Sequence, residues 1–391
     1  MPGTLRGRAA IVGAADTQVG VVPGVSATQL CVEAILRALA DAGIDKSAVD
    51  GLVTCNSMAE PYLYHAEAMA EYLQIFPSYC VSVGAGGGTT FTALHQAASA
   101  IASGICHTVV IAMADSLRSG LSRERALAVQ SSTGHPQFEA PYGAPVPGYY
   151  ALIARAHMHE FGTTPEQLAA VAVSTRQHAA RNPAAQMRTP ITIEDVLNSR
   201  LIADPLHLLD CSLVSDGGAA VVVTSAERAA DFPHRPVYLR GVGEGHGHEH
   251  ISQARSLTSS AAADSGRRAY EMAGVGPRDI DFAQLYDCFT PVVLIELEDL
   301  GFCAKGEGGP FVASGCTGPG GSLPVNTHGG LLSHCHPGNP GSMFALTEAV
   351  LQLRGQAGER QLPKAELGLV HAQGGIMSSH STVILGRERD S

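Results

Sequence analysis

A glycine-rich turn at residues 83–93, with the sequence VGAGGGTTFTA, follows a predicted strand at residues 79–83 and opens a predicted helix. The first N–H groups of a helix have no partner inside that helix, and they can hold an anion or a developing oxyanion. Gly87 and Gly88 are therefore candidate positions for binding a substrate oxygen. The glycine spacing does not match a dinucleotide-binding fingerprint, and no suitable acidic residue follows the next strand.

A tyrosine stands where another predicted strand, residues 282–286, passes into a helix, within the sequence LYDCFT at residues 285–290. A phenol at a strand end can act as a general acid or base if its pKa is shifted, which makes Tyr286 a candidate catalytic residue. The alternative is a tyrosine that only packs, with its hydroxyl group satisfied by a neighbour.

Three histidines and a cysteine crowd residues 325–341, VNTHGGLLSHCHPGNPG, just before a predicted helix. A helix N-terminus favours the neutral form of a histidine, which can then donate one hydrogen bond to an enolate or thioester oxygen. The candidates are His328, Gly329, Gly330 and His336. The sequence leaves open whether His334 or His336 faces the site, and histidines exposed in a polar turn are the alternative.

A fourth turn of this kind, VHAQGG at residues 370–375, follows a predicted strand at residues 367–371. It adds His371, Gly374 and Gly375 to the candidates. In open α/β sheets, ligands bind beyond the ends of the strands. The four turns therefore predict one shared site.

A histidine-rich segment, GHGHEH at residues 245–250, could bind a metal ion through its alternate imidazoles and a carboxylate. No partner ligands with metal spacing follow it, and a solvated loop is the simpler interpretation. The group formed by His334, Cys335 and His336 is a weaker candidate still. We therefore predict no metal site.

The composition excludes several classes of protein. Of 391 residues, 45% are hydrophobic, enough for one large or two medium domains with a core. A formal charge of -11, without a Lys/Arg block and without Trp, disfavours nucleic acid and anionic membranes as partners. The nine cysteines contain no CxxC pair, and no apolar signal or membrane-spanning run occurs. We expect a soluble cytoplasmic protein.

The chain contains two similar halves. Residues 38–50, ALADAGIDKSAVD, align without a gap with residues 269–281, AYEMAGVGPRDID. In each half an amphipathic helix ends at a glycine, Gly43 or Gly274, and a strand follows. Strands alternate with helices elsewhere too, which predicts a layered α/β fold. Predicted strands are 9–13, 52–55, 79–83, 108–113, 237–242, 282–286, 367–371 and 382–385; predicted helices are 27–42 with Ser26 as N-cap, 260–273, 292–300 and 342–353.

Residues from about 116 to 210 break this alternation with many prolines and short helical pieces. An inserted loop subdomain of this kind commonly shapes the entrance to a substrate site. The first half resumes with the sequence DGGAAVVV at residues 216–223. The expected domains are therefore residues 1–234, which include the insertion, and residues 235–391.

Several separated segments resemble the thiolase superfamily, in particular the sterol-carrier-protein-type thiolases and the related aldolases that work with a small OB-fold partner. They are SDGGAA at 215–220, YDCFT at 286–290, LEDLGFC at 297–303, NTHGG at 326–330 and HP at 336–337. The resemblance covers residues 9–386. It implies two βαβαβαββ halves in a five-layered αβαβα sandwich, usually as a homodimer.

The resemblance also implies roles for individual residues. Gly87 corresponds to the acyl-accepting cysteine of thiolases, and His371 lies near their second, proton-shuttling cysteine. His336 corresponds to a histidine of the oxyanion hole, and Tyr286 to a residue that holds a catalytic water. Both family cysteines are therefore absent. A subset of relatives uses the tyrosine of this motif for retro-aldol cleavage of β-hydroxyacyl-CoA in steroid side-chain degradation, although those aldolases carry a second tyrosine at the position of His336.

The predicted activity is therefore the making or breaking of a carbon–carbon bond next to a CoA thioester without an acyl-cysteine, most concretely a retro-aldol cleavage. Tyr286 would be the base, and His336 with backbone amides around Gly87 would stabilise the enolate. CoA would be part of the substrate, with no separate cofactor. A small OB-fold and zinc-ribbon protein is the expected partner.

Two alternatives remain from the sequence. The first is an acetyl-CoA acetyltransferase or thiolase-type acyltransferase that uses a relocated cysteine, for which Cys80, Cys288 and Cys335 are candidates. The second is a degenerate subunit that binds CoA esters or a partner without turnover.

Overall fold

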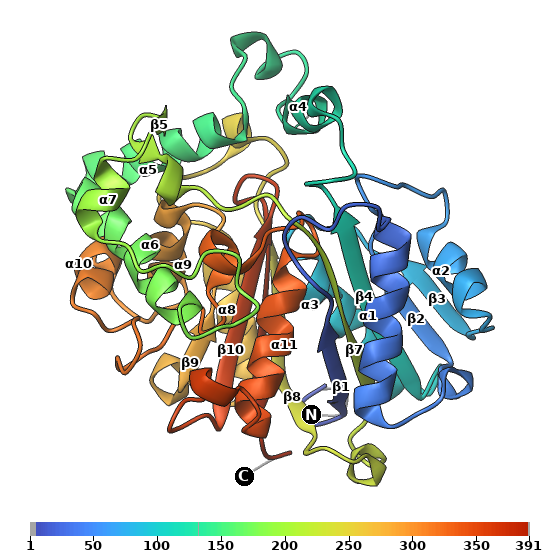
Figure 1. The fold of residues 1–391 in the computed structure, drawn as a ribbon. Helices are drawn as coiled ribbons and strands as arrows, with labels where there is room; N and C mark the ends of the chain where they lie inside the picture. The colour runs from blue at the N-terminus through green and yellow to red at the C-terminus, as the bar shows by residue number, and fades with distance from the viewer. Residues whose placement is uncertain (1–4, 132, 390–391) are drawn as a thin grey trace.

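A computed structural model describes residues 5–131 and 133–389, and these residues form a mixed sheet of nine strands in the order β3-β2-β4-β7-β1-β8-β11-β10-β9 (Figure 1). The first half of the chain supplies β1 (Ala9–Asp16), β2 (Gly51–Thr54), β3 (Tyr79–Ser82), β4 (Thr108–Ser116) and β7 (Asp216–Ser225). The second half supplies β8 (Val237–His246), β9 (Phe282–Gln284), β10 (Leu367–Gly374) and β11 (Ser379–Gly386). The halves join where β1 pairs antiparallel with β8.

The helices complete the layers. Helices α1 (Ala27–Ala42) and α2 (His65–Leu73) cover the outer face of the first half, and α8 (Ala262–Ala273) covers that of the second. Helices α3 (Thr89–Ala102) and α11 (Gly341–Arg354) lie between the two half-sheets and contact strands of both (Figure 1). The five layers of the predicted sandwich are therefore confirmed, with the halves joined edge to edge as one sheet.

The predicted duplication is confirmed by a repeated packing detail. A Cβ atom on Gly13 of β1 would collide with the carbonyl oxygen of Ala38 in α1, and one on Gly241 of β8 would collide with that of Ala269 in α8. Ala38 and Ala269 are aligned positions in the two repeats. In both halves only a glycine lets the helix lie this close to its strand. Both helices then end at a glycine with φ near +68°, as the sequence predicts.

The second half has less regular strand structure than the first half in two places. Its counterpart of β3 is only an isolated bridge between Ala283 and Val325. Strand β9 ends at Gln284 rather than at residue 286, because the Leu285 N–H donates to Oδ1 of Asn326 at 2.7 Å instead of to a neighbouring strand. Tyr286 therefore stands in a loop just beyond the strand, where its side chain can turn away from the sheet.

The inserted segment between β4 and β7 contains α4 (Arg123–Ser131), α5 (Val146–Phe161), α6 (Pro165–Ala179), α7 (Ile193–Leu197), β5 (Leu201–Ala203) and β6 (Leu206–His207). It lies above one end of the sheet (Figure 1). Helices α9 (Thr290–Asp299) and α10 (Gly308–Ala313) pack against α6. None of the described helices is long and apolar enough to cross a membrane.

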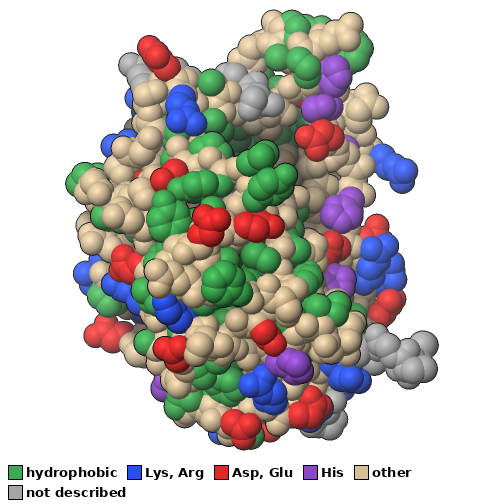
Figure 2. Space-filling model, turned by 90° about the vertical axis from the view of Figure 1, so that its right-hand side faces the viewer, with side chains coloured by type: hydrophobic (Ala, Val, Ile, Leu, Met, Phe, Trp, Pro, Cys, Tyr) green, Lys and Arg blue, Asp and Glu red, His purple; other side chains and the backbone are tan. Residues whose placement is uncertain are grey.

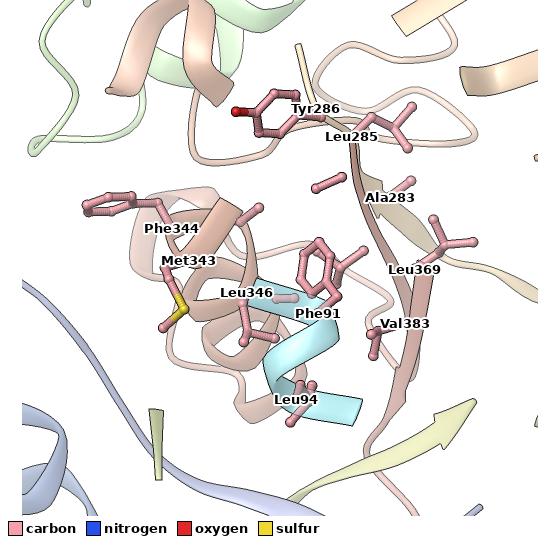
Figure 3. Packing of buried hydrophobic residues seen from close by; sticks show 14 of the residues in the cluster. Phe91, Leu94, Ala283, Leu285, Tyr286, Met343, Phe344, Leu346, Leu369 and Val383 are labelled. Carbon is pink, nitrogen blue, oxygen red and sulfur yellow. The ribbon is translucent and has the colours of Figure 1, made fainter. Parts of the chain in front are cut away.

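The core between the half-sheets holds the start of α3 in place. Figure 3 shows Phe91 and Leu94 of α3 beside Leu346 of α11 and facing Val383 of the sheet, with Tyr286 above them. Phe91 and Leu94 are fully buried, which stabilises the fold by about 1.5–3 kcal/mol for each side chain. The turn that precedes α3 is thereby fixed beneath the Tyr286 ring.

Candidate active site

A cavity of about 400 Å³ opens where the turn before α3, the end of β10, the inserted segment and the loop after β9 meet. Its polar and glycine lining includes Gly86, Gly87, Tyr150, Ser212, Tyr286, His336, Asn339, Gln373, Gly374 and Gly375. Of the predicted site residues, the structure therefore brings Gly87, Tyr286, His336, Gly374 and Gly375 to one cavity.

Tyr286, His336 and Ser212 form a chain of hydrogen bonds along one wall. The Tyr286 hydroxyl oxygen lies 3.1 Å from Nε2 of His336, and Nδ1 of His336 lies 2.8 Å from Oγ of Ser212. The backbone N–H of His336 donates to Oγ of Ser215 at 2.9 Å, which fixes the ring position. If the phenol donates to Nε2, then Nδ1–H donates to Ser212, and every polar atom of the chain has a partner.

Burial keeps both members of this pair neutral. Loss of solvent raises the pKa of Tyr286 well above its usual 10, and the nearby Cys288, Asp287 and Glu296 act in the same direction. Loss of solvent lowers the pKa of His336 to about 4. The phenol therefore keeps its proton at pH 7, and the imidazole is free to receive one.

Gly87 lies directly beneath the phenol. A Cβ atom on residue 87 would collide with Cζ and Oη of Tyr286 and would lie 2.5 Å from the carbonyl oxygen of Gln373. A side chain at position 87 and the observed place of Tyr286 therefore exclude one another. The space that a nucleophile on this turn would need is filled by the phenol.

Two glycine turns touch at the floor of the cavity. Gly86 has φ +57°, and a Cβ atom there would lie 2.6 Å from Cα of Gly374. Gly375 also has a positive φ, +65°. Gly88 caps the start of α3, beside these turns rather than on the cavity wall. The positive end of the α3 dipole and the backbone of both turns consequently face the same space.

The segment that contains His328, Gly329 and Gly330 lies behind the cavity and does not line it. His328 is buried against Gln284, whose Oε1 lies 3.1 Å from its Nδ1. A Cβ atom on Gly330, where φ is +56°, would collide with the carboxylate of Asp287. These three residues belong to a tight turn, and none of them lines the cavity, so the predicted binding role has no geometric basis for them.

The structure decides between the two histidines that the sequence left open. His334 is buried, and its ring packs edge-on against Phe344 and His328. His336, two residues later, is the one that faces the cavity. The π-helical turn Gly330–His334 just before it rotates the chain so that these two side chains point in different directions.

His371 also lies outside the cavity, contrary to the prediction. Its ring is buried below the cavity floor, with Nδ1 2.8 Å from Oγ1 of Thr382 and Nε2 3.2 Å from Nδ1 of His380. Side chains two residues apart on a strand share a face. Gln373, at the strand end, reaches the cavity on that face, whereas His371 is too deep.

A second polar wall of the cavity is formed by residues that are not among the predicted site residues. Gln373 donates from Nε2 to the hydroxyl of Tyr150 at 2.6 Å, and Tyr150 donates to the carbonyl oxygen of Gly375 at 3.1 Å. The Tyr150 ring stacks on Phe289 with centroids 4.4 Å apart. Gln373 lies within the VHAQGG turn, and strand alternation from His371 predicts that both side chains share a face. Tyr150 comes from the inserted segment and gave no local signal.

None of the three cysteines that the sequence suggests as a relocated nucleophile is suited to that role. Cys80 and Cys335 do not line the cavity. Cys288 lines it, but burial raises the pKa of its thiol far above the usual value. The relocated-cysteine alternative therefore lacks a suitably placed thiolate.

The histidine-rich segment at residues 245–250 does not assemble ligands. Among the residues that the structure describes, the one group of three close metal-binding side chains consists of Glu296, His371 and His380. This group is not among the metal-binding candidates that the sequence suggests.

Family models for the thiolase N-terminal domain and for the thiolase C-terminal domain-like region match residues 9–227 and 243–387. The chain belongs to the thiolase family. Within it, the chain is 40% identical to a steroid side-chain-cleaving aldolase of Thermomonospora curvata, covering 98% of this chain and 99% of the relative. It is 40% identical to the 17-hydroxy-3-oxo-4-pregnene-20-carboxyl-CoA lyase of Mycobacterium tuberculosis, covering 90% and 92%.

A third relative has a different activity. An acetyl-CoA acetyltransferase of Methanothermobacter thermautotrophicus is 35% identical, covering 97% of this chain and 99% of the relative. Among solved structures, the Ltp2-ChsH2(DUF35) aldolase is similar with a TM-score of 0.87 and 39% identity, covering 98% of both chains. The site has no cysteine on the turn before α3, as the aldolase prediction requires, so this member of the family is a thiolase-like carbon–carbon lyase.

Proposed function

We propose that the protein cleaves a β-hydroxyacyl-CoA by a retro-aldol reaction in which Tyr286 and His336 move the proton. The observation that carries this proposal is the 3.1 Å contact between Oη of Tyr286 and Nε2 of His336, in the space that a nucleophile at position 87 would occupy. The products are a shorter acyl-CoA and a ketone or aldehyde.

The proton transfer follows from the neutral state of both groups. As the phenol passes its proton to Nε2 of His336, its oxygen accepts the proton of the substrate β-hydroxyl. The bond between Cα and Cβ then breaks, Cβ becomes a carbonyl, and the electron pair moves to the thioester as an enolate. The same pair returns the proton to Cα, so no proton is gained or lost overall.

The role expected of His336 changes with this geometry. Its Nε2 faces Tyr286 and its Nδ1 faces Ser212, so neither ring nitrogen is available to an enolate oxygen. We place the enolate oxygen against the backbone of Gly87 and the start of α3 instead. Amide N–H groups fixed at a helix start stabilise a developing negative charge without having to reorganise.

The substrate class is a CoA ester with a bulky apolar acyl group. Apolar side chains from the inserted segment and the loops around it line the cavity: Met58, Leu117, Leu121, Ala126, Val129, Val146, Pro147, Leu213, Val214, Phe289 and Ile376. Two relatives with 40% identity are named for steroid side-chain cleavage and for a pregnene-carboxyl-CoA. A steroid-like acyl-CoA fits both facts.

A partner protein of the DUF35 class is part of the proposal, because the similar aldolase structure is a complex that includes one. The measurement is the cleavage rate of the chain alone and after co-expression with such a partner. We expect a large rate increase, and equal rates in both preparations would remove the partner from the proposal.

A homodimer is also proposed, through the sheet edge formed by β3. The exposed apolar residues Leu63, Tyr64, Tyr72 and Phe76 lie on or near α2, which packs against this edge. Phe76 is 99% exposed. Figure 2 shows hydrophobic side chains gathered on this side of the molecule. An exposed strand edge with apolar neighbours is a ready surface for another chain. Replacing Phe76 with Glu should shift the mass measured by light scattering from dimer to monomer.

The decisive test of the reaction is cleavage of a β-hydroxyacyl-CoA by the Tyr286→Phe variant. We expect kcat to fall by about 10²–10⁴-fold, the usual contribution of a general base, with little change in CoA-ester affinity. Tyr270→Phe is the matched control, since Tyr270 donates to the carbonyl oxygen of Leu300 away from the cavity. Full activity of Tyr286→Phe would show that the phenol is not the base.

A further inference from the structure

A group of buried ionisable side chains lies beneath the active-site floor and takes no part in the proposed reaction. Glu296 comes from α9, His371 from β10 and His380 from β11. One ligand atom from each lies within 4.8 Å of the other two, and all three side chains are almost completely buried. The two histidines are nine positions apart on paired strands, and Glu296 lies 75 positions before His371 in the chain. The group forms only when the chain is folded, which explains why the spacing of the sequence did not reveal it.

The nitrogens of the two histidines face each other. Nε2 of His371 lies 3.2 Å from Nδ1 of His380, and the rings are stacked with their planes at 22°. Oε1 of Glu296 lies 3.7 Å from Nε2 of His371. Donor atoms around a four-coordinate zinc ion are separated by about 3.3 Å when the bonds are 2.0–2.2 Å long. Two of the three separations, 3.2 Å and 3.7 Å, are close to this value, and all three lie within 4.8 Å.

Protons alone do not satisfy this group. A hydrogen bond between the two imidazoles uses one proton and leaves Oε1 of Glu296 without a partner, although it is buried. The distance of 3.7 Å from Nε2 of His371 is too long for a hydrogen bond. An unsatisfied buried carboxylate oxygen is costly, and a cation in contact with all three donor atoms would remove that cost.

The surroundings of His371 resemble the outer shell of a metal site. Its Nδ1 lies 2.8 Å from Oγ1 of Thr382, which in turn lies 2.8 Å from Oγ of Ser265 on α8. A hydrogen bond at the far nitrogen holds the ring and leaves Nε2 as the electron-pair donor, as second-shell partners of metal-bound histidines do. The other carboxylate oxygen of Glu296 accepts the N–H of Tyr286 at 3.0 Å, which fixes the glutamate as well.

We infer that Glu296, His371 and His380 form a binding site for one zinc-like divalent cation. Two imidazole nitrogens and one carboxylate oxygen suit zinc and neighbouring transition metals, whereas calcium and magnesium prefer a shell of oxygen atoms. The site has three protein ligands, and the fourth position is left for a water molecule. None of the three side chains lines the cavity, so the ion would not contact the substrate.

The test is cobalt and zinc binding by the purified full-length chain after treatment with a chelator. We expect one Co²⁺ per chain, with the intense visible absorption bands of a four-coordinate ion, displaced by Zn²⁺. Zinc should also raise the melting temperature of the wild-type protein, because a ligand that binds only the folded state stabilises it. Zinc-edge X-ray absorption of the wild-type protein should show two imidazole ligands at about 2.0–2.1 Å.

Three variants locate the ion. Glu296→Gln and His380→Asn should each weaken binding by at least about tenfold, since each removes or replaces one ligand. His178→Asn is the matched control, because His178 is equally buried but bonds to the carbonyl oxygen of Thr317. A double variant, His246→Ala with His248→Ala, removes two of the three histidines of residues 245–250 and should bind the ion normally.

Two results of the binding measurements would overturn the site. One is a wild-type protein that takes up no cobalt or zinc, and the other is binding that disappears in the His246/His248 double variant. If neither ligand variant folds, the absorption spectrum and the X-ray data on the wild-type protein still decide, since a six-coordinate ion or an oxygen-only shell contradicts the proposal.

Discussion

The hydroxyl group of Tyr286 stands in the space that a side chain on residue 87 would fill. A Cβ atom at position 87 would overlap Cζ and Oη of the tyrosine, so the missing nucleophile and the presence of the phenol are one structural feature. Oη then lies 3.1 Å from Nε2 of His336, the group that can accept its proton. The phenol can therefore reach His336 only because residue 87 has no side chain.

The first prediction concerns restoration of the nucleophile. Gly87→Cys should not produce thiolase activity and should destabilise the protein by about 1–3 kcal/mol, because the new side chain overpacks against Tyr286 and the carbonyl oxygen of Gln373. Thermal unfolding and a thiolysis assay measure both effects. Gly84→Cys is the control, since a Cβ atom there meets nothing within 4 Å. A stable Gly87→Cys enzyme with thiolase turnover would contradict the steric argument.

The second prediction concerns the covalent state of the enzyme during turnover. Incubation with acetyl-CoA or a longer acyl-CoA should leave the intact protein mass unchanged, since the thiol of Cys288 is buried and its pKa is raised. Intact-protein mass spectrometry measures this, with a cysteine-dependent thiolase treated in parallel as a positive control. An acyl adduct mapped to Cys288 or Cys211, both in the cavity lining, would instead support the acyltransferase alternative.

The third prediction concerns the pH profile of cleavage. The pKa of His336 is lowered to about 4 and that of Tyr286 is raised above 10, so both groups stay neutral throughout the neutral pH range. We expect kcat/KM of the wild-type enzyme to stay flat between about pH 6 and 9. Steady-state rates across this range measure it, with enzyme stability checked at each pH. A bell-shaped profile centred near pH 7 would show that one of these groups titrates differently.

The fourth prediction concerns stability in acid. Burial lowers the pKa of His178 to about 4 and that of His334 to about 3, whereas both are near 6.5 in the unfolded chain. The unfolded state therefore binds more protons below pH 6.5, and stability falls from there down to the folded-state values. At about 1.4 kcal/mol for each pKa unit, the complete loss is on the order of 3–5 kcal/mol for each histidine.

Melting temperatures at pH 7.5 and pH 5 test this prediction. The wild-type protein should melt clearly lower at the acid pH. The His178→Asn variant, although less stable at pH 7.5, should lose less on acidification because one of the buried imidazoles is gone. Equal melting temperatures at the two pH values would contradict the argument.

The fifth prediction concerns the acyl group. Val146 stands at the start of α5 on the cavity wall. Val146→Trp replaces an isopropyl group with an indole ring in a space of about 400 Å³. We expect KM for a steroid-like β-hydroxyacyl-CoA to rise by about tenfold or more, while a short-chain β-hydroxyacyl-CoA is still cleaved. Competition assays that contain both substrates measure the ratio of their kcat/KM values. A similar loss for both substrates would place the acyl group elsewhere.

Much of the fold could be predicted because it depends on local patterns. Helix α1 begins after Ser26 and ends at Gly43 as predicted, since the capping box and the left-handed glycine are both local signals. The repeated motif that contains Ala38 and Ala269 identified the two halves correctly. The predicted strands differ from the observed ones mainly at their ends, as for β9, where the side chain of Asn326 replaces a neighbouring strand.

The candidate site could be predicted only in part. Gly87, Tyr286 and His336 stand at turns next to strand or helix ends, and such turns converge at one edge of an α/β sheet. His328 and His371 belong to two of the turns that were predicted to form the site. Whether their side chains reach the cavity or are buried behind it depends on how the chain bends. Tyr150 was missed because it reaches the cavity from an inserted segment with no periodic pattern.

The sequence by itself determined the two repeated α/β halves, the place of the insertion, the absence of a cysteine at residue 87 and the presence of a tyrosine at residue 286. Only the tertiary structure decided that these two residues share one space, that His336 rather than His334 meets the phenol, and that Glu296 lies against His371 and His380. The physical reason is that periodicity and capping act over a few residues, whereas side-chain contacts between distant segments depend on how the layers pack.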